Sequence, residues 1–165
     1  MGKKKAKKKK EVIKEEVFHA IKILCVMSFV GFILSMLVDT GNYMSFSSVE
    51  ELKMAKDQIP FEKLETTIDN FESVGLDISQ KGLDKVAFMY LMRTLIDILA
   101  MVGVVFMFFE IKKGLIIYTI FQFVYVLVPF LFFGGVALVV VPYSSVAITL
   151  IYVALFTSQR KYLVK

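Results

Sequence analysis

The stretch VAFMYLMRTLIDILAMVGVVFMFF, residues 86–109, decides the fold. Only two of its 24 residues carry charge, Arg93 and Asp97, and nearly all the others are apolar. An α-helix needs roughly 20 apolar residues to cross the hydrocarbon core of a bilayer. Residues 86–109 therefore predict a transmembrane helix and place the chain among the membrane proteins.

Three further segments extend this interpretation along the chain. Of the 165 residues, 57% are hydrophobic, against about 45–50% in soluble domains. The excess is concentrated in residues 18–38, 114–133 and 136–157. Together with residues 86–109, these segments predict an all-α integral membrane protein built as a bundle of four transmembrane helices.

The fourth segment is divided by Pro142. A helix that began only after this proline would have about 15 residues and span about 22 Å, which is short for a bilayer core of about 30 Å. Two alternatives follow. Either a transmembrane helix over residues 136–157 kinks at Pro142, or residues 137–141 form an outer loop that is tucked into the protein. We favour the kinked helix.

The largest polar stretch is residues 39–85, which hold ten acidic residues and five lysines and therefore a net charge of −5. Behind Pro60, four apolar residues recur at helical spacing: Phe61, Leu64, Ile68 and Phe71, here called the outer stripe. This pattern predicts a short amphipathic helix in the loop. Because the acidic residues between them disfavour anionic lipid, we expect the outer stripe to fold onto the helix ends or to bind a partner protein.

The distribution of basic residues predicts the orientation of the chain. Lys and Arg near the ends of membrane helices are retained in the cytoplasm. Basic residues occur in the tail over residues 1–17, in the turn at residues 112–113 and in the C-terminal residues 158–165. With four crossings, all three fall on one side. The sequence therefore predicts a cytoplasmic (inner) membrane protein with both termini in the cytoplasm and residues 39–85 outside.

The N-terminal tail carries seven lysines within its first ten residues: Lys3, Lys4, Lys5, Lys7, Lys8, Lys9 and Lys10. A cluster of this kind attracts anionic lipid headgroups, at about 1 kcal/mol per lysine near the surface. We favour this role for the tail. The alternative is docking onto an anionic partner, such as ribosomal RNA or an acidic protein face.

Arg93 and Asp97 lie four residues apart, so they share one helix face and can form an ion pair. Asp97 is about 16 Å from the start of its segment, near the midplane, where ionisable residues are rare and by default mark function. Polar side chains of the other segments reach the same depth: Gln122, Tyr125 and Thr149. We interpret Arg93 and Asp97 as a structural pair that fixes helix register. The alternative is a proton or ion relay.

The first segment, residues 18–38, carries a seam of small side chains at helical spacing: Ser28, Gly31 and Ser35. Seams of this kind allow neighbouring membrane helices to approach closely. We therefore expect this face to turn toward the other helices.

Residue types that support metal or covalent chemistry are scarce. The chain has one cysteine, Cys25, and one histidine, His19, whereas a disulfide or a metal site needs several such residues. The sequence also contains no Gly-rich phosphate loop and no nucleophile elbow. It predicts no catalytic residue, no metal and no cofactor, and no small-molecule substrate can be inferred from it.

The stretch FFEIKKGLIIYTIFQFVYVLVPFLFFGG (residues 108–135), with the closing YVALFTSQRKYLVK (residues 152–165), resembles a group of small four-helix inner-membrane proteins common in Bacteroidota. In that group a Lys/Gly turn leads into a helix with Tyr, Gln and Pro, here Tyr118, Gln122 and Pro129. The resemblance covers roughly residues 86–165. It implies a four-helix membrane fold and no particular activity.

These features together predict a non-catalytic accessory or scaffold subunit of a larger membrane assembly. The lysine tail would contact anionic lipid or a cytoplasmic partner, and the outer stripe would contact other membrane proteins. The alternative function is a small transporter or channel that uses Arg93 and Asp97.

Single cysteines at three positions test the topology. In intact cells, an impermeant thiol reagent should label Asp69→Cys and leave Lys8→Cys and Ser158→Cys unlabelled, because the last two positions face the cytoplasm. All three should react once the membrane is permeabilised. Labelling of Ser158→Cys from outside would mean an odd number of crossings and contradict the four-helix prediction.

Overall fold

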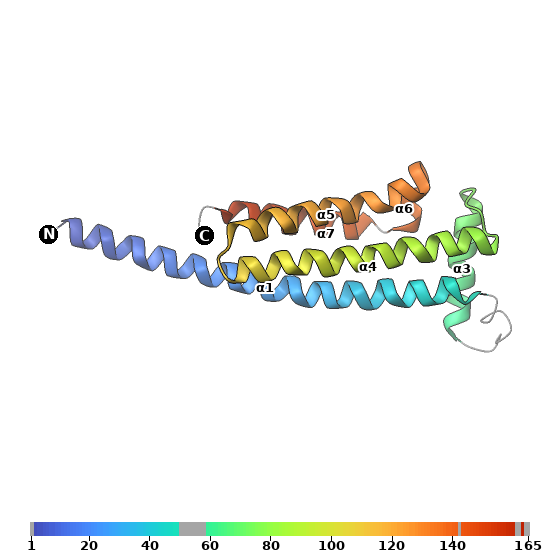
Figure 1. Cartoon of the computed structure of the whole chain (residues 1–165), viewed down its shortest axis with the longest axis horizontal. Helices are drawn as coiled ribbons and strands as arrows, with labels where there is room; N and C mark the ends of the chain where they lie inside the picture. Colours follow the sequence, from blue (N-terminus) through green and yellow to red (C-terminus); the bar gives the residue numbers. More distant parts are fainter. Residues whose placement is uncertain (1, 50–58, 142, 161–162, 164–165) are drawn as a thin grey trace.

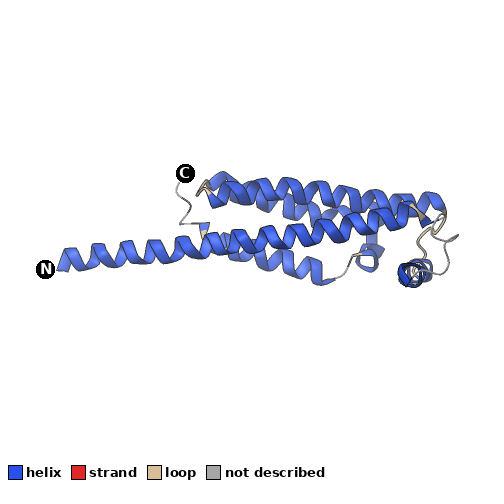
Figure 2. Ribbon diagram, turned by 90° about the horizontal axis from the view of Figure 1, so that it is seen from below, coloured by secondary structure: helices blue, strands red, loops and turns tan. Residues whose placement is uncertain are grey.

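The computed structural model describes residues 2–49, 59–141, 143–160 and 163, and every regular element within them is helical (Figures 1 and 2). The elements are α1 (Gly2–Ser47), α3 (Ile59–Ser73), α4 (Gln80–Phe108), α5 (Lys112–Phe133), the 3-10 helix η1 (Gly134–Val136), α6 (Ala137–Val140) and α7 (Tyr143–Ser158). Stretches long and apolar enough to cross a membrane are His19–Ser47, Gln80–Phe108 and Lys112–Val140. Helix α7 is apolar but shorter, with 16 residues. The predicted all-α class is confirmed, and three of the described helical stretches have the length and composition of membrane spans.

Helices α1, α4, α5 and α7 lie alongside one another and run alternately in opposite directions (Figure 1). Helix α4 packs closely along both α1 and α5, whereas α7 approaches α5 and α1 at only a few points. The α4–α5 turn, the end of α7 and the N-terminal part of α1 lie at one end of this bundle, and α3 and α6 lie at the other (Figure 1). The described parts of the three basic segments therefore lie toward the same end of the molecule.

Helix α1 continues beyond the predicted segment, through Asp39 to Ser47. No proline interrupts it, and Tyr43 and Phe46 carry its apolar face onward into the core. Asp39 is therefore a residue of a long helix, and the prediction that the outer loop begins at this residue is wrong. The sequence predicts a membrane boundary at this residue because an unpaired charge is costly in lipid, but Asp39 is paired with Arg93 in the interior.

In the other direction α1 continues without a break to Gly2 and projects beyond the packed helices as a single arm (Figures 1 and 2). The lysine-rich residues 3–10 belong to this arm. Their side chains lie outside the described residues, so their contact with anionic lipid or with an anionic partner stays a prediction.

The outer stripe is buried within the chain itself. Helix α3 lies across the end of the bundle (Figures 1 and 2), and Leu64, Ile68 and Phe71 are buried in an apolar cluster with residues of α1 and α4. The Phe71 ring stacks on the ring of Phe46, with centroids 5.7 Å apart. The side chain of Phe61 lies outside the described residues. Of the two predicted alternatives, the structure shows the first, and these three residues do not form a free docking surface.

Helix α4 starts at Gln80, earlier than the predicted start at residue 86, because a capping residue precedes it. The Ser79 hydroxyl accepts a hydrogen bond from the Gly82 N–H at 3.4 Å, which satisfies one of the free donors of the first turn. The Asp77 carboxylate accepts the Ser79 N–H at 2.9 Å. Hydrogen bonds from the side chain and then the backbone of Ser79 lower the pKa of Asp77.

The fourth predicted segment, residues 136–157, is not one kinked helix. Helix α6 ends at Val140, Val141 is extended with φ −123° and ψ 124°, and α7 begins at Tyr143. Pro142 lies outside the described residues. The Tyr90 hydroxyl donates to the Val140 carbonyl at 3.1 Å, which satisfies an acceptor at the end of α6. The favoured kinked helix is therefore wrong. The tucked-in loop does not describe the segment either, because residues 137–140 are helical, with Ala137 and Val140 buried.

Two glycines let α4 and α5 approach closely. A Cβ added to Gly103 would lie 2.6 Å from the backbone nitrogen of Tyr118, and one added to Gly114 would lie 2.5 Å from the carbonyl oxygen of Gly103. A Cβ added to Gly31 of α1 would meet no atom within 4 Å. The close helix–helix contact is therefore between α4 and α5. The predicted seam of small residues on α1 does not form a close contact with another helix at Gly31.

Gly103→Ala should destabilise the protein by about 1–3 kcal/mol, the usual cost of overpacking, because its methyl group would collide with the backbone of α5. The measurement is the free energy of unfolding in mild detergent. Gly31→Ala is the matched control, since it adds the same methyl group to another membrane helix where space is free. Equal effects of the two substitutions would contradict the close packing of α4 on α5.

Candidate functional site

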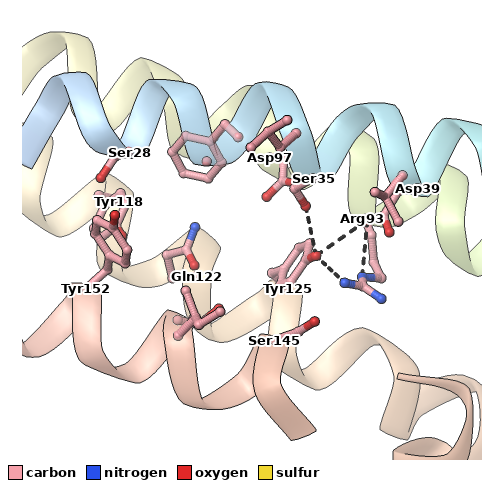
Figure 3. A pocket seen from close by; sticks show the side chains of 16 residues that line it. Ser28, Ser35, Asp39, Arg93, Asp97, Tyr118, Gln122, Tyr125, Ser145 and Tyr152 are labelled. Carbon is pink, nitrogen blue, oxygen red and sulfur yellow. Dashed lines mark hydrogen bonds and ion pairs between the residues drawn. The ribbon is translucent and has the colours of Figure 1, made fainter. Parts of the chain in front are cut away.

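Polar side chains gather in the middle of the bundle, between two apolar clusters. The cluster near α3 contains Phe46 and Phe71, and the cluster toward the α4–α5 turn contains Cys25 and Phe156. Between them, α1, α4, α5 and α7 enclose a cavity of about 350 Å³ (Figure 3). The polar residues that line it are Ser28, Ser35, Asp39, Arg93, Asp97, Tyr118, Gln122, Tyr125, Ser145, Thr149 and Tyr152.

Helical periodicity brings these residues to the cavity. On α1, Ser28, Ser35 and Asp39 are separated by seven and four residues, so they share one face. Gly31 also lines the cavity. The predicted seam is therefore a cavity wall. Its spacing continues from Ser35 to Asp39, and this continuation is the signal in the sequence that could have included Asp39 in the site.

Arg93 is paired with Asp39 and not with Asp97. The Arg93 Nε lies 3.4 Å from Asp39 Oδ2, and both side chains are almost completely buried. The contact is an ion pair without hydrogen-bond geometry, since Nε has no hydrogen-bond partner among the described residues. The predicted ion pair between Arg93 and Asp97 is therefore wrong. Their spacing on α4 permits a contact, but the guanidinium points toward α1 and α5 (Figure 3).

Tyr125 of α5 completes this cluster. Its hydroxyl accepts a hydrogen bond from the guanidinium of Arg93 and donates to Asp39 Oδ2 at 3.5 Å. It also lies 3.0 Å from Ser35 Oγ. Either hydroxyl can be the donor in that contact. The Arg93 guanidinium also lies over the ring of Tyr125, 4.3 Å from its centroid, and 5.7 Å from that of Tyr90.

Asp97 has a hydroxyl neighbour, Ser35, but no ion-pair partner among the described residues. It is 2% exposed, and its Oδ2 has no hydrogen-bond partner among the described residues. The buried hydroxyl of Ser28 is likewise without a partner there. The cavity holds two carboxylates against one guanidinium. With both acids ionised, the site therefore carries one excess negative charge, and that charge is on Asp97.

The three predicted polar partners all line the cavity. Tyr125 contacts Arg93 directly, whereas Gln122 and Thr149 are buried on the cavity wall. The three residues therefore line the same cavity as the charged residues of α4, although the contacts that they make are not those of an Arg93–Asp97 pair.

The cavity is open on the side between α1 and α7. Three of its lining residues are apolar and exposed: Leu34 and Val38 on α1, and Ile148 on α7. Because α1 and α7 approach each other at few points, no helix of the described chain covers this side. In a membrane, acyl chains would face this opening.

The cavity offers charged and hydrogen-bonding groups. Its described lining residues supply carboxylate, guanidinium, amide and hydroxyl groups, without cysteine or histidine. The described part of the chain contains no group of three His, Cys, Asp or Glu side chains that could hold a metal ion.

Comparisons of the chain with protein-family models, curated proteins and solved structures give no match. The predicted resemblance to Bacteroidota membrane proteins therefore stays a prediction. The function has to be inferred from the cavity and the charges that line it.

A double-mutant cycle tests the identity of the ion pair. Arg93→Leu should cost about 3–5 kcal/mol, because it leaves Asp39 buried without its counter-charge. Adding Asp39→Leu to Arg93→Leu should recover most of this loss, since both charges are then removed. The matched cycle uses Asp97→Leu, and its coupling to Arg93 should be smaller. The measurement is the free energy of unfolding in detergent, and a larger coupling with Asp97 would contradict the assignment.

Proposed function

We propose that the protein is a small four-helix membrane transporter, not an enzyme, and that its substrate site is the cavity among α1, α4, α5 and α7. The cavity itself carries this proposal. Its volume of about 350 Å³ falls in the range of small-molecule sites, roughly 300–1,000 Å³, which combine apolar walls with a few polar groups. Ionisable residues inside membrane helices are costly, and they mark substrate and ion pathways.

In this proposal α7 is the fourth crossing. Its 16 residues span about 24 Å, and a short helix of this kind is accommodated by local thinning of the bilayer. Four crossings put both termini on one side. The grouping of the α4–α5 turn, the C-terminal end and the arm of α1 at one end of the molecule (Figure 1) supports a cytoplasmic location for all three.

The loose packing of α7 favours a transporter over a purely structural subunit. Helices α1, α4 and α5 are tied together by close packing and by the Arg93 cluster. Helix α7 forms one wall of the cavity but makes few close approaches to its neighbours. Segments with few packing contacts open at the lowest free-energy cost, so α7 is the wall that can move to admit a solute.

A second candidate is the accessory subunit predicted from the sequence. The observation that favours it is the arm of α1, which continues to Gly2 as one helix and carries the lysine-rich residues beyond the bundle (Figure 1). Such an arm could dock on an anionic partner. The role of an accessory subunit does not use the cavity. In addition, the outer stripe, which was predicted to contact other membrane proteins, is buried at Leu64, Ile68 and Phe71.

Accessibility of the cavity tests the transporter proposal. A small membrane-permeant thiol reagent should modify Ser35→Cys in native membranes, because Ser35 lines the open cavity. The native Cys25 is the internal control, since it is fully buried in an apolar cluster and should stay unmodified. Mass spectrometry counts the modified sites. If Ser35→Cys were as unreactive as Cys25, the cavity would be closed to solutes. The transporter proposal would then be wrong, and the accessory subunit would remain as the candidate function.

A further inference from the structure

Asp97 differs from the other charged residues of the cavity because no basic side chain among the described residues forms an ion pair with it. The charge of Asp39 is matched by Arg93, and the Arg93 guanidinium is already occupied by Asp39 and Tyr125. Asp97 lies on the same cavity wall with Oδ2 buried and unpartnered. An excess carboxylate inside a membrane protein is stable only when a cation or a proton neutralises it.

We infer that the cavity binds a protonated organic amine with an apolar body, and that the ammonium group pairs with the carboxylate of Asp97. This inference rests on the proposed function and names the class of substrate. It goes beyond the polar cavity itself because it assigns the sign of the ligand's charge and the residue that recognises it.

The walls of the cavity favour a cation over an anion. An anionic ligand would be repelled by the Asp97 carboxylate, and the charge of the Arg93 guanidinium is already matched by Asp39. Aromatic residues line the cavity: Phe32, Tyr118, Tyr125 and Tyr152. The faces of aromatic rings attract cations, and ammonium groups in particular.

The hydrogen-bonding groups favour an amine over a bare metal ion. Three buried side-chain atoms of the cavity-lining residues have no hydrogen-bond partner among the described residues: Asp97 Oδ2, Ser28 Oγ and Arg93 Nε. Arg93 Nε already lies 3.4 Å from Asp39 Oδ2, whereas the two oxygens can accept hydrogen bonds from the N–H donors of an ammonium group. The volume of about 350 Å³ is also that of an organic molecule and not that of an ion.

The open side of the cavity favours a ligand whose body is apolar. Leu34, Val38 and Ile148 flank the opening between α1 and α7 and are exposed. A ligand whose charged end is held at Asp97 would place its remaining part against these side chains and toward the lipid. An amine that partitions into the bilayer could enter through this opening.

Binding of phenylbutylammonium and of phenylbutanol to the purified full-length protein tests the inference. The two compounds share the apolar body and differ in charge at neutral pH. The amine should bind at least about tenfold more tightly than the alcohol, a difference of roughly 1.4 kcal/mol, in titration calorimetry, and it should raise the unfolding temperature. Asp97→Asn should remove the preference, whereas Asp97→Glu should keep it.

Asp84→Asn is the matched control, because Asp84 is an exposed acid of the same helix that accepts a hydrogen bond from Gln80, and this change should keep the preference for the amine. A second measurement needs no change at Asp97. The amine should protect Ser35→Cys from the thiol reagent, and the alcohol should protect it less at the same concentration.

Equal binding of amine and alcohol would overturn the inference and leave the solute cavity in place. Stabilisation by sodium chloride alone, with no added effect of the amine, would also overturn it. So would a preference for the amine that persists in a folded Asp97→Asn variant. Failure of the proposed function looks different, since Ser35→Cys would then be unreactive whether or not a ligand is present.

Discussion

The guanidinium of Arg93 is a positive charge buried near the middle of α4. A charge in a medium of low dielectric constant needs a counter-charge and hydrogen-bond acceptors. Asp39 of α1 supplies the first, and Tyr125 of α5 supplies an acceptor. This requirement sets the rotation and the register of α1 and α5 relative to α4, because a shift of either helix would remove a partner from the guanidinium.

The same pairing determines the character of the cavity. Because Asp39 neutralises Arg93, no cation of the described lining residues is left for Asp97. A polar layer then lies between two apolar clusters, one reaching α3 and the other reaching the α4–α5 turn. The apolar clusters hold the helices together above and below the layer, so the layer itself can stay open.

The two sides of the bundle are built differently. On one side, Gly103 and Gly114 bring α4 and α5 so close that no side chain would fit between their backbones. On the other side, Gly31 faces open space and α7 has few neighbours. At the end of the bundle, α3 and α6 close the apolar cluster through Phe71 stacked on Phe46 and through the Tyr90 hydroxyl bonded to Val140. The closely packed helices α1, α4 and α5 thus form the other walls of the cavity, and only the wall formed by α7 is loosely packed.

The sequence by itself determined the helical membrane class, because long apolar runs such as residues 86–109 are a local property of the chain. Helical spacing also placed Gln122, Tyr125 and Thr149 on the faces that line the cavity. The partner of Arg93 was decided only by the tertiary structure. Asp97 is its neighbour in sequence, yet Asp39, which is 54 positions away, is its neighbour in space. Local spacing shows which residues can share a helix face, but the direction in which a buried charge points depends on which other helix brings the better-placed counter-charge.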